Sequence, residues 1–276
     1  MTPSECERLA RALLPSVLEA GAIEMRYYRS GVAIERKADA SPVTAADREA
    51  EVVLLAALAH IAPGVPVIAE EAVGRGTVPP IADAFFLVDP LDGTREFINQ
   101  RDEFTVNVAL VQGGKPVFGI VFAPALGDLC VTLGLARAGH ARVAATTPAS
   151  ALGAVEFADI RTRRPDRAAL VAVASLAHGA AEADRFLAPY RVSARRNAGS
   201  SLKFCLLARG QADIYPRIGP TMEWDTAAGH AILAAAGGSV TELDGAPFIY
   251  GKADKGFLNP GFVAWGTPGP IPPVSG

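Results

Sequence analysis

The feature that most constrains this chain is an apolar strand that runs directly into two carboxylates. Phe85 to Val88 are all apolar, and Asp89, Pro90, Asp92 and Gly93 follow at once. Proline cannot continue a strand ladder and glycine permits a tight turn, so we expect the strand to end here with both carboxylates converging on one point. Two such anions repel each other unless a cation or a proton lies between them, which suggests a hard divalent metal. A strand-end Asx turn is the structural alternative.

Two further segments place carboxylates where an element begins or ends. Glu70 and Glu71 follow the apolar run Val67 to Ala69, and Asp225 lies in EWDTAAGH. Taken alone, the glutamates are typical of a solvated surface pair and the aspartate of a helix cap. Three element ends that each supply a carboxylate, without a competing cysteine or histidine cluster, favour magnesium over zinc. With a hydroxyl such as that of Thr94 beside them, the set predicts phosphoryl hydrolysis.

The composition indicates a large globular chain with little net charge. Half of its 276 residues are apolar, and 26 basic against 29 acidic residues give a formal charge of −3. No long basic run offers an electrostatic footprint for nucleic acid or for a membrane surface. The three cysteines fit neither a disulfide framework nor a metal pattern, which predicts reduced thiols in a cytoplasmic protein. The N-terminus does not read as a signal peptide, and no apolar run approaches the length of a bilayer span.

Hydrophobic periodicity predicts two N-terminal helices followed by a set of strands. The first helix covers residues 4–29, where Pro15 must kink the helix or start its second half. The second begins after Thr44, an N-cap that forms a variant capping box with Asp47, and it ends at Pro63. Strands are predicted at residues 65–69, 84–88, 105–111 and 116–124, with QGGK as a hairpin turn between the last two.

The second half alternates strands and helices. Strands are predicted at residues 169–175, 190–196 and 212–216, with helices near 178–188, 200–208 and 224–236. A Thr-, Pro- and Arg-rich stretch around residues 146–168 marks a lobe boundary. We therefore expect an N-terminal α+β lobe over residues 1–148, a C-terminal α/β lobe over 149–266 and a disordered tail over 267–276.

At the level of motifs, the chain resembles a known superfamily. DPLDGT, the upstream glutamate pair and WDTAAG together resemble the metal-dependent, lithium-sensitive sugar phosphatases that include the inositol monophosphatases. KADASPVTAAD, DGTREFINQRDEFTVNVALV, GSSLKFC and YPRIGPT are similar to the CysQ-type 3′(2′),5′-bisphosphate nucleotidases, and the likeness runs from about residue 5 to residue 264. The resemblance implies an α+β fold, a layered αβαβα sandwich with the site between the two lobes.

The resemblance also implies a metal site and a catalytic pair. It implies two or three magnesium ions held by the side chains of Glu70, Asp89, Asp92 and Asp225 and by the backbone carbonyl of Leu91. It implies that Asp47 and Thr94, together with Glu70, position and deprotonate the attacking water, without a covalent phosphoenzyme. Metals in such a site lower the pKa of water and neutralise charge on the phosphoryl oxygens.

The substrate residues come from the same resemblance and from one local pattern. GSSLK opens a predicted helix whose free N–H groups and dipole suit an anion, although the same residues would also serve as a simple cap. By resemblance, the substrate contacts are Gly93, Thr94, His178, Ser200, Ser201, Lys203, Arg217 and Asp225. On local grounds alone, His178 is typical of a structural histidine at a helix start, and the other three histidines are interpreted as structural.

The activity implied is removal of the 3′-phosphate from 3′-phosphoadenosine 5′-phosphate to give AMP and phosphate. By resemblance, this reaction would clear a by-product of sulfate assimilation and would be inhibited by lithium. The alternatives are the same chemistry on inositol monophosphate or fructose 1,6-bisphosphate, and a non-catalytic protein that binds a phosphorylated nucleotide. We expect a small-molecule partner and a cytoplasmic location, with peripheral attachment to the inner face of the cell membrane as an option. The sequence leaves the oligomeric state open.

Overall fold

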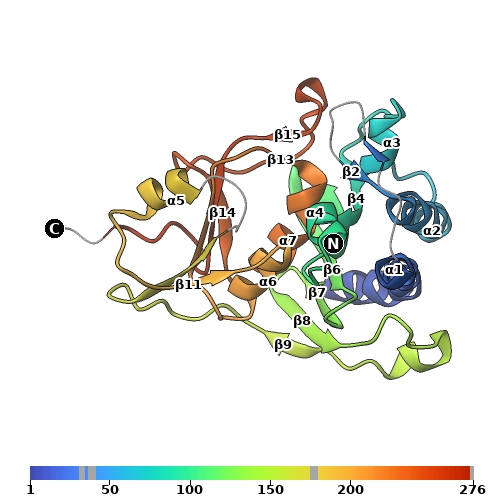
Figure 1. The fold of residues 1–276 in the computed structure, drawn as a ribbon, viewed down its shortest axis with the longest axis horizontal. Helices are drawn as coiled ribbons and strands as arrows, with labels where there is room; N and C mark the ends of the chain where they lie inside the picture. Colours follow the sequence, from blue (N-terminus) through green and yellow to red (C-terminus); the bar gives the residue numbers. More distant parts are fainter. Residues whose placement is uncertain (31–34, 37–41, 175–179, 274–276) are drawn as a thin grey trace.

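The described residues fold into two large mixed β-sheets, with helices outside and between them, and two small two-stranded sheets. Residues 1–30, 35–36, 42–174 and 180–273 are described by the structure, a computed structural model. Figure 1 shows the first half of the chain on one side of the molecule and most of the second half on the other. Within the described residues, no helix is both long enough and apolar enough to cross a membrane.

The N-terminal half builds the larger sheet and the helices on its outer face. Its helices are α1 (Pro3–Ser30), α2 (Ala45–Ile61), α3 (Glu70–Gly74) and α4 (Thr94–Ile98), with a 3₁₀ turn at Ala149–Ala154. Its strands are β1 (Glu35–Arg36), β2 (Pro42–Val43), β3 (Val67–Ala69), β4 (Ala84–Asp92), β5 (Thr105–Gln112), β6 (Lys115–Ala123), β7 (Asp128–Gly134), β8 (Arg137–Arg142) and β9 (Ala158–Ile160).

The C-terminal half builds the smaller sheet, the helices of the middle layer and a helix on the outer face of that sheet. Its helices are α5 (Ala180–Leu187), α6 (Leu202–Ala208) and α7 (Glu223–Ala235), with a 3₁₀ turn at Ala253–Lys255. Its strands are β10 (Leu170–Ala174), β11 (Val192–Asn197), β12 (Ile214–Arg217), β13 (Thr221–Met222), β14 (Ser239–Glu242), β15 (Leu258–Asn259) and β16 (Phe262–Trp265).

The strand orders and the buried side chains define five layers. In the described chain, the larger sheet runs β3-β4-β5-β6-β7-β8-β9 and the smaller one β11-β10-β12-β16-β14. Leu13 of α1 packs with Phe118 on one face of the larger sheet, and Phe85 packs with Phe204 of α6 on the opposite face. The outer face of the smaller sheet packs on Leu187 of α5. The predicted αβαβα sandwich is therefore confirmed (Figure 1).

Strand β4 is longer than predicted. It continues through Pro90 to Asp92, which pairs with Thr105 of β5, and the register shifts between Asp89 and Asp92. The prediction that Pro90 ends the strand is wrong, because a bulge accommodates the residue that cannot donate to the ladder. Gly93 follows with φ +92°, in the left-handed region that favours glycine.

Other local predictions match the structure closely. α1 is one helix with Pro15 inside it, and Thr44 caps α2 while its own backbone N–H donates to Asp47 Oδ2 at 2.8 Å. Gly113 and Gly114 form the turn between β5 and β6 with φ of +57° and +71°. These features depend on neighbouring residues in the sequence, so a local pattern is enough to predict them.

The structure differs from the sequence prediction at the lobe boundary and in the C-terminal tail. Strand β9 pairs with β8 of the larger sheet, although its residues were placed in the C-terminal lobe. Ile271, in the tail expected to be disordered, is buried against the smaller sheet, and Arg167 Nη2 donates to the Pro272 carbonyl at 3.2 Å. This part of the tail therefore packs on the protein, which corrects the expectation of disorder there. The division into two lobes stays a prediction.

Candidate active site

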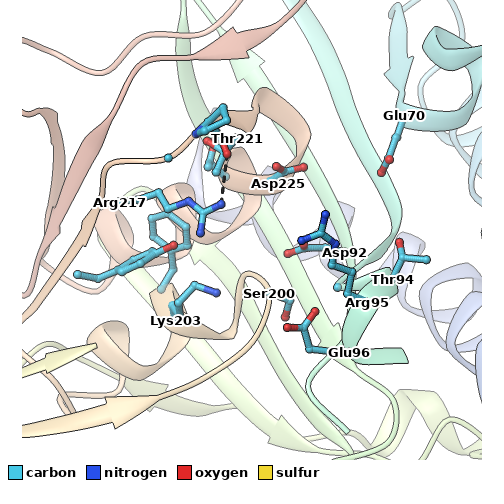
Figure 2. A pocket seen from close by; sticks show the side chains of 16 residues that line it. Glu70, Asp92, Thr94, Arg95, Glu96, Ser200, Lys203, Arg217, Thr221 and Asp225 are labelled. Atoms are coloured by element: carbon cyan, nitrogen blue, oxygen red, sulfur yellow. Dashed lines mark hydrogen bonds between the residues drawn. The ribbon is translucent and has the colours of Figure 1, made fainter. Parts of the chain in front are cut away.

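The end of β4 opens into a cavity of about 580 Å³ that both halves of the chain line. Figure 2 shows the carboxylates on one side of this cavity, together with Arg95, and Lys203 and Arg217 on the other. The lining residues are Glu70, Asp92, Gly93, Thr94, Arg95, Glu96, Ser200, Lys203, Phe204, Tyr215, Arg217, Gly219, Pro220, Thr221, Asp225 and Thr226.

The β4 bulge places its two aspartates at different depths. Asp89 is buried below the cavity, and its Oδ1 accepts a hydrogen bond from the Leu91 backbone N–H at 3.0 Å. Asp92 lines the cavity, and its Oδ2 accepts from the Ser201 backbone N–H at 2.6 Å. The loop before α6 is thereby fixed to the carboxylate side of the site.

Two more carboxylates reach the same region from other elements. Glu70 begins α3 directly after β3, and the parallel pairing of Ala69 with Val88 brings it beside Asp89. Asp225 lies in the first turn of α7, where its Oδ2 accepts from the Met222 backbone N–H at 2.8 Å. The structure therefore brings together all four carboxylates that the sequence singled out.

The electrostatics show how strongly these groups affect one another. Burial, followed by the nearby charges of Glu70, Asp92 and Asp225, raises the pKa of Asp89 well above its ordinary value. Burial and the charges of Asp92 and Glu70 do the same to the pKa of Asp225. Burial also raises the pKa of Asp92 to about 6, although the charge of Lys203 opposes this. Such a cluster is costly to bury unless protons or cations neutralise it.

The donor set fits a hard divalent cation. Buried carboxylates and the Leu91 carbonyl offer oxygen ligands, which magnesium prefers, and the raised pKa values of Asp89 and Asp225 mark an excess of negative charge. In the described part of the chain, no three acidic, histidine or cysteine side chains are already close enough together to hold one ion. The fit therefore rests on the chemistry of the donors and not on a preformed coordination shell.

Asp47 and Thr94 meet at the edge of this cluster. Asp47 is buried, and its Oδ2 accepts from the Thr44 backbone N–H and, at 2.6 Å, from the Thr44 hydroxyl. Its Oδ1 lies 3.5 Å from Thr94 Oγ1, which also lies 3.3 Å from the Leu91 carbonyl oxygen. The α2 capping box thus holds Asp47 in place and directs its second oxygen towards Thr94.

The opposite wall of the cavity is cationic, and some of the polar atoms described around the cavity lack a hydrogen-bond partner. Burial lowers the pKa of Lys203 to about 8, while the charge of Asp92 opposes this, and its Nζ lies 5.5 Å from the Tyr215 ring centroid. Within the described residues, two buried atoms that face the cavity have no hydrogen-bond partner, Arg217 Nε on this wall and Ser200 Oγ, which lies between this wall and the carboxylates (Figure 2). An orphaned hydroxyl and an orphaned guanidinium nitrogen beside one cavity are typical of a site that binds a polar ligand.

Not every residue expected to touch substrate lines the cavity. Ser201 is turned towards β5, where its hydroxyl bonds to Thr105 Oγ1 at 2.9 Å and to Asn107 Oδ1 at 2.7 Å, so its assignment as a substrate contact is corrected. His178 lies outside the described residues. The lining also includes Arg95 and Glu96, which sequence reasoning missed although both directly follow the DGT motif.

The layered fold and this cavity define a class of α+β proteins whose carboxylate site lies where the two halves of the chain meet. The model of the inositol monophosphatase family matches residues 5–261. The CysQ 3′(2′),5′-bisphosphate nucleotidase of Shigella flexneri is 42% identical over 226 residues, which cover 82% of this chain and 86% of that protein. The CysQ 3′(2′),5′-bisphosphate nucleotidase of Salmonella typhimurium is 42% identical over 245 residues, covering 88% and 94%.

The crystal structure of CysQ from Bacteroides thetaiotaomicron, a bacterial member of the same family, superposes with a TM-score of 0.76. It is 36% identical, and the match covers 94% of this chain and 97% of that one. The chain belongs to the inositol monophosphatase family.

Proposed function

We propose that this protein is a magnesium-dependent 3′(2′),5′-bisphosphate nucleotidase. It hydrolyses the 3′-phosphate of 3′-phosphoadenosine 5′-phosphate with one water, giving AMP and inorganic phosphate. The observation that carries the proposal is the division of one cavity into a carboxylate side and a cationic side that contains Lys203 and Arg217. A substrate with two phosphates fits such a cavity, and the relatives named above support the nucleotide over other phosphates.

The carboxylate side would hold the magnesium ions. The ligands would be the side chains of Glu70, Asp89, Asp92 and Asp225 and the carbonyl of Leu91, and two or three ions would neutralise their charge. When bound, magnesium lowers the pKa of water and offsets charge on the phosphoryl oxygens and the leaving alkoxide.

Asp47 and Thr94 would prepare the attacking water. The Thr94 hydroxyl donates to Asp47 Oδ1 or to the Leu91 carbonyl, so its oxygen is free to accept a proton from a water molecule. As the water attacks phosphorus in line, it passes a proton to Thr94 Oγ1 while the Thr94 hydroxyl proton passes to Asp47 Oδ1. The bond between phosphorus and the 3′-oxygen breaks, and the released 3′-oxygen takes a proton from solvent water to become the 3′-hydroxyl of AMP. Two hydrogen bonds from Thr44 keep the Asp47 side chain in one orientation throughout.

The cationic side would bind the remainder of the nucleotide. Lys203, Arg217 and the Ser200 hydroxyl offer charge-assisted and neutral hydrogen bonds to the second phosphate. Gly93 keeps its assignment as a substrate contact, and a side chain at this position would strain the turn, because φ is +92° and a β-carbon would lie only 3.1 Å from the Glu103 carbonyl oxygen. His178 keeps its assignment as a contact near the adenosine.

Two other functions are tested by the same experiment. Inositol monophosphate or fructose 1,6-bisphosphate would use the same carboxylates, and a non-catalytic nucleotide-binding protein would use only the cationic side. Retaining buried like charges without a metal is costly, which argues against the non-catalytic function. The setting proposed for the reaction is the cytoplasm.

The test is phosphate release by the purified protein in magnesium. It compares 3′-phosphoadenosine 5′-phosphate with inositol 1-phosphate and fructose 1,6-bisphosphate, each with and without lithium. We expect the nucleotide to be preferred and lithium to inhibit. Preference for a sugar or inositol phosphate would overturn the substrate while keeping the chemistry, and stoichiometric nucleotide binding without turnover would overturn the enzymatic proposal.

A further inference from the structure

Helix α3 carries Glu70 but lacks a cap of its own. It spans only Glu70–Gly74, and its N-cap position is Ala69, whose methyl side chain cannot accept a hydrogen bond. The first backbone N–H groups of a helix have no partner within the helix, so a buried helix start requires an acceptor from elsewhere. At α3 this acceptor also matters for the site, because the first residue of the helix, Glu70, lines the cavity.

Glu51 of α2 supplies the acceptor. Its Oε2 accepts from the backbone N–H groups of Glu71 at 2.8 Å and Ala72 at 3.2 Å, and its Oε1 accepts from Arg75 Nη2 at 2.8 Å. The Glu51 side chain is 1% exposed, whereas that of Arg75 is 54% exposed. One buried carboxylate therefore binds both ends of the short helix, its first turn through the backbone and its C-cap residue through a side chain.

We propose that Glu51 is a positioning residue that caps α3 from the neighbouring helix and thereby fixes the direction in which Glu70 presents its carboxylate. This inference rests on the proposed role of Glu70 as a metal ligand. Glu51 does not line the cavity and would act only through α3. Groups that orient a ligand in this way change metal affinity by about 10- to 100-fold when they are replaced.

The chain offers a rescue for the obvious variant. Glu51→Gln keeps the shape of the side chain but removes the charge that strengthens the hydrogen bonds from the Glu71 and Ala72 amides, and its single oxygen cannot accept from both these amides and Arg75. Ala69 has φ −118° and ψ 143°, the extended conformation in which a serine caps a helix. Ala69→Ser should therefore supply an acceptor within α3 itself. Arg75→Met is the matched control, because it removes the ion pair and leaves the capping hydrogen bonds.

The experiment measures magnesium binding by calorimetry without substrate, and hydrogen exchange at the Glu71 and Ala72 amides in the metal-free protein. For Glu51→Gln we expect magnesium to bind about 10-fold more weakly, with faster exchange at both amides. The nucleotide KM at saturating magnesium should be unchanged. The double variant with Ala69→Ser should recover most of the affinity, and Arg75→Met should stay within about twofold of the original protein.

Faster exchange in Glu51→Gln with unchanged magnesium affinity would overturn the proposal, because Glu51 would then stabilise α3 without orienting Glu70. Failure of the double variant to recover affinity while it recovers slow exchange would also overturn it. If Glu51→Gln does not fold, magnesium affinity and amide exchange are compared between the original protein and the double variant Glu51→Gln with Ala69→Ser. A protein that binds magnesium but releases no phosphate from any nucleotide would refute the proposed function and leave this test intact.

Discussion

Asp89 is the residue whose environment makes the sharpest prediction. It is buried, and burial together with the charges of Glu70, Asp92 and Asp225 raises its pKa. An ionised Asp89 therefore lowers the stability of the metal-free protein. Asp89→Asn is nearly isosteric and removes one of the repelling charges. We expect phosphate release to fall by about 100-fold or more, while the melting temperature of the metal-free protein does not fall.

The measurement pairs a phosphate-release assay with thermal unfolding in chelator and in magnesium. Magnesium should stabilise Asp89→Asn less than it stabilises the original protein, because one ligand charge is missing. Asp159→Asn, at a half-exposed residue paired with Arg137 far from the cavity, is a matched control. Undiminished turnover in Asp89→Asn would remove Asp89 from the metal site.

Lys203 is the residue best suited to separate nucleotide recognition from catalysis. Its ammonium group is buried beside the cavity, over the ring of Tyr215. Lys203→Met keeps an apolar stem in contact with the aromatic ring and removes the charge. A charge-assisted hydrogen bond to phosphate contributes about 1.5–3 kcal/mol, so kcat/KM for the bisphosphate nucleotide should fall roughly 10- to 100-fold.

The comparison substrate for Lys203→Met is a small phosphate monoester that lacks the second phosphate. Its kcat/KM should change by less than about threefold when magnesium is saturating. Saturation matters because the charge of Lys203 also lowers the pKa of Asp92. Equal losses on both substrates would place Lys203 in the metal site and not in nucleotide recognition.

At the scale of elements, the turn before α6 sends two adjacent serines to different places. Ser200 has φ +46°, and its hydroxyl lies at the cavity, whereas the Ser201 hydroxyl bonds to Thr105 and Asn107 of β5. Ser200→Ala should raise the nucleotide KM about 3- to 10-fold with little change in stability. Ser201→Ala should instead lower the free energy of unfolding by about 1–3 kcal/mol and leave KM nearly unchanged.

Each serine variant is the control for the other, and both are assayed by nucleotide kinetics and by urea unfolding. A larger KM effect from Ser201→Ala than from Ser200→Ala would reverse the assignment. Sequence alone could not separate the two, because a serine with positive φ carries no local signal of that conformation.

The same limit explains which parts of the elements could be predicted. Thr44, the paired glycines of the β5–β6 turn and the apolar periods of the helices act on near neighbours, so their patterns are readable. The bulge between Asp89 and Asp92 depends on how β5 pairs opposite it. From sequence alone, a proline predicts the end of a strand. Only the pairing with β5 shows that the hydrogen-bonded ladder continues beyond Pro90.

At the scale of the whole molecule, unpredicted features come from contacts between distant segments. Strand β9 pairs with the larger sheet although it follows the lobe boundary predicted from the sequence. In the sequence, Glu51 resembles an ordinary surface glutamate, and only the packing of α3 against α2 shows its role as a cap. The four carboxylates could nevertheless be identified, because each lies in a recognisable sequence motif. Their convergence, in contrast, is set by the order of the strands and by where α7 packs.

Helix α7 also ties stability of the whole molecule to pH through His230. This residue lies in the middle layer, where Nδ1 is 3.1 Å from the Tyr250 hydroxyl, and burial lowers its pKa to about 3. An unfolded histidine has a pKa of about 6.5, so between these values the unfolded chain binds one more proton than the folded protein. The contribution of His230 to stability is therefore complete above pH 6.5 and is lost as the pH falls below it.

We expect this histidine to cost about 2 kcal/mol of unfolding free energy at pH 5 relative to pH 8. The buried carboxylates act in the opposite direction, since their raised pKa values favour the folded state as the pH falls. The free energy of unfolding in urea is measured at both pH values for the original protein and for His230→Gln, with chelator present throughout. The difference between the two proteins cancels the contribution of the carboxylates. The glutamine variant should lose about 2 kcal/mol less on going to pH 5. An equal loss in both proteins would show that His230 takes up its proton without unfolding the chain.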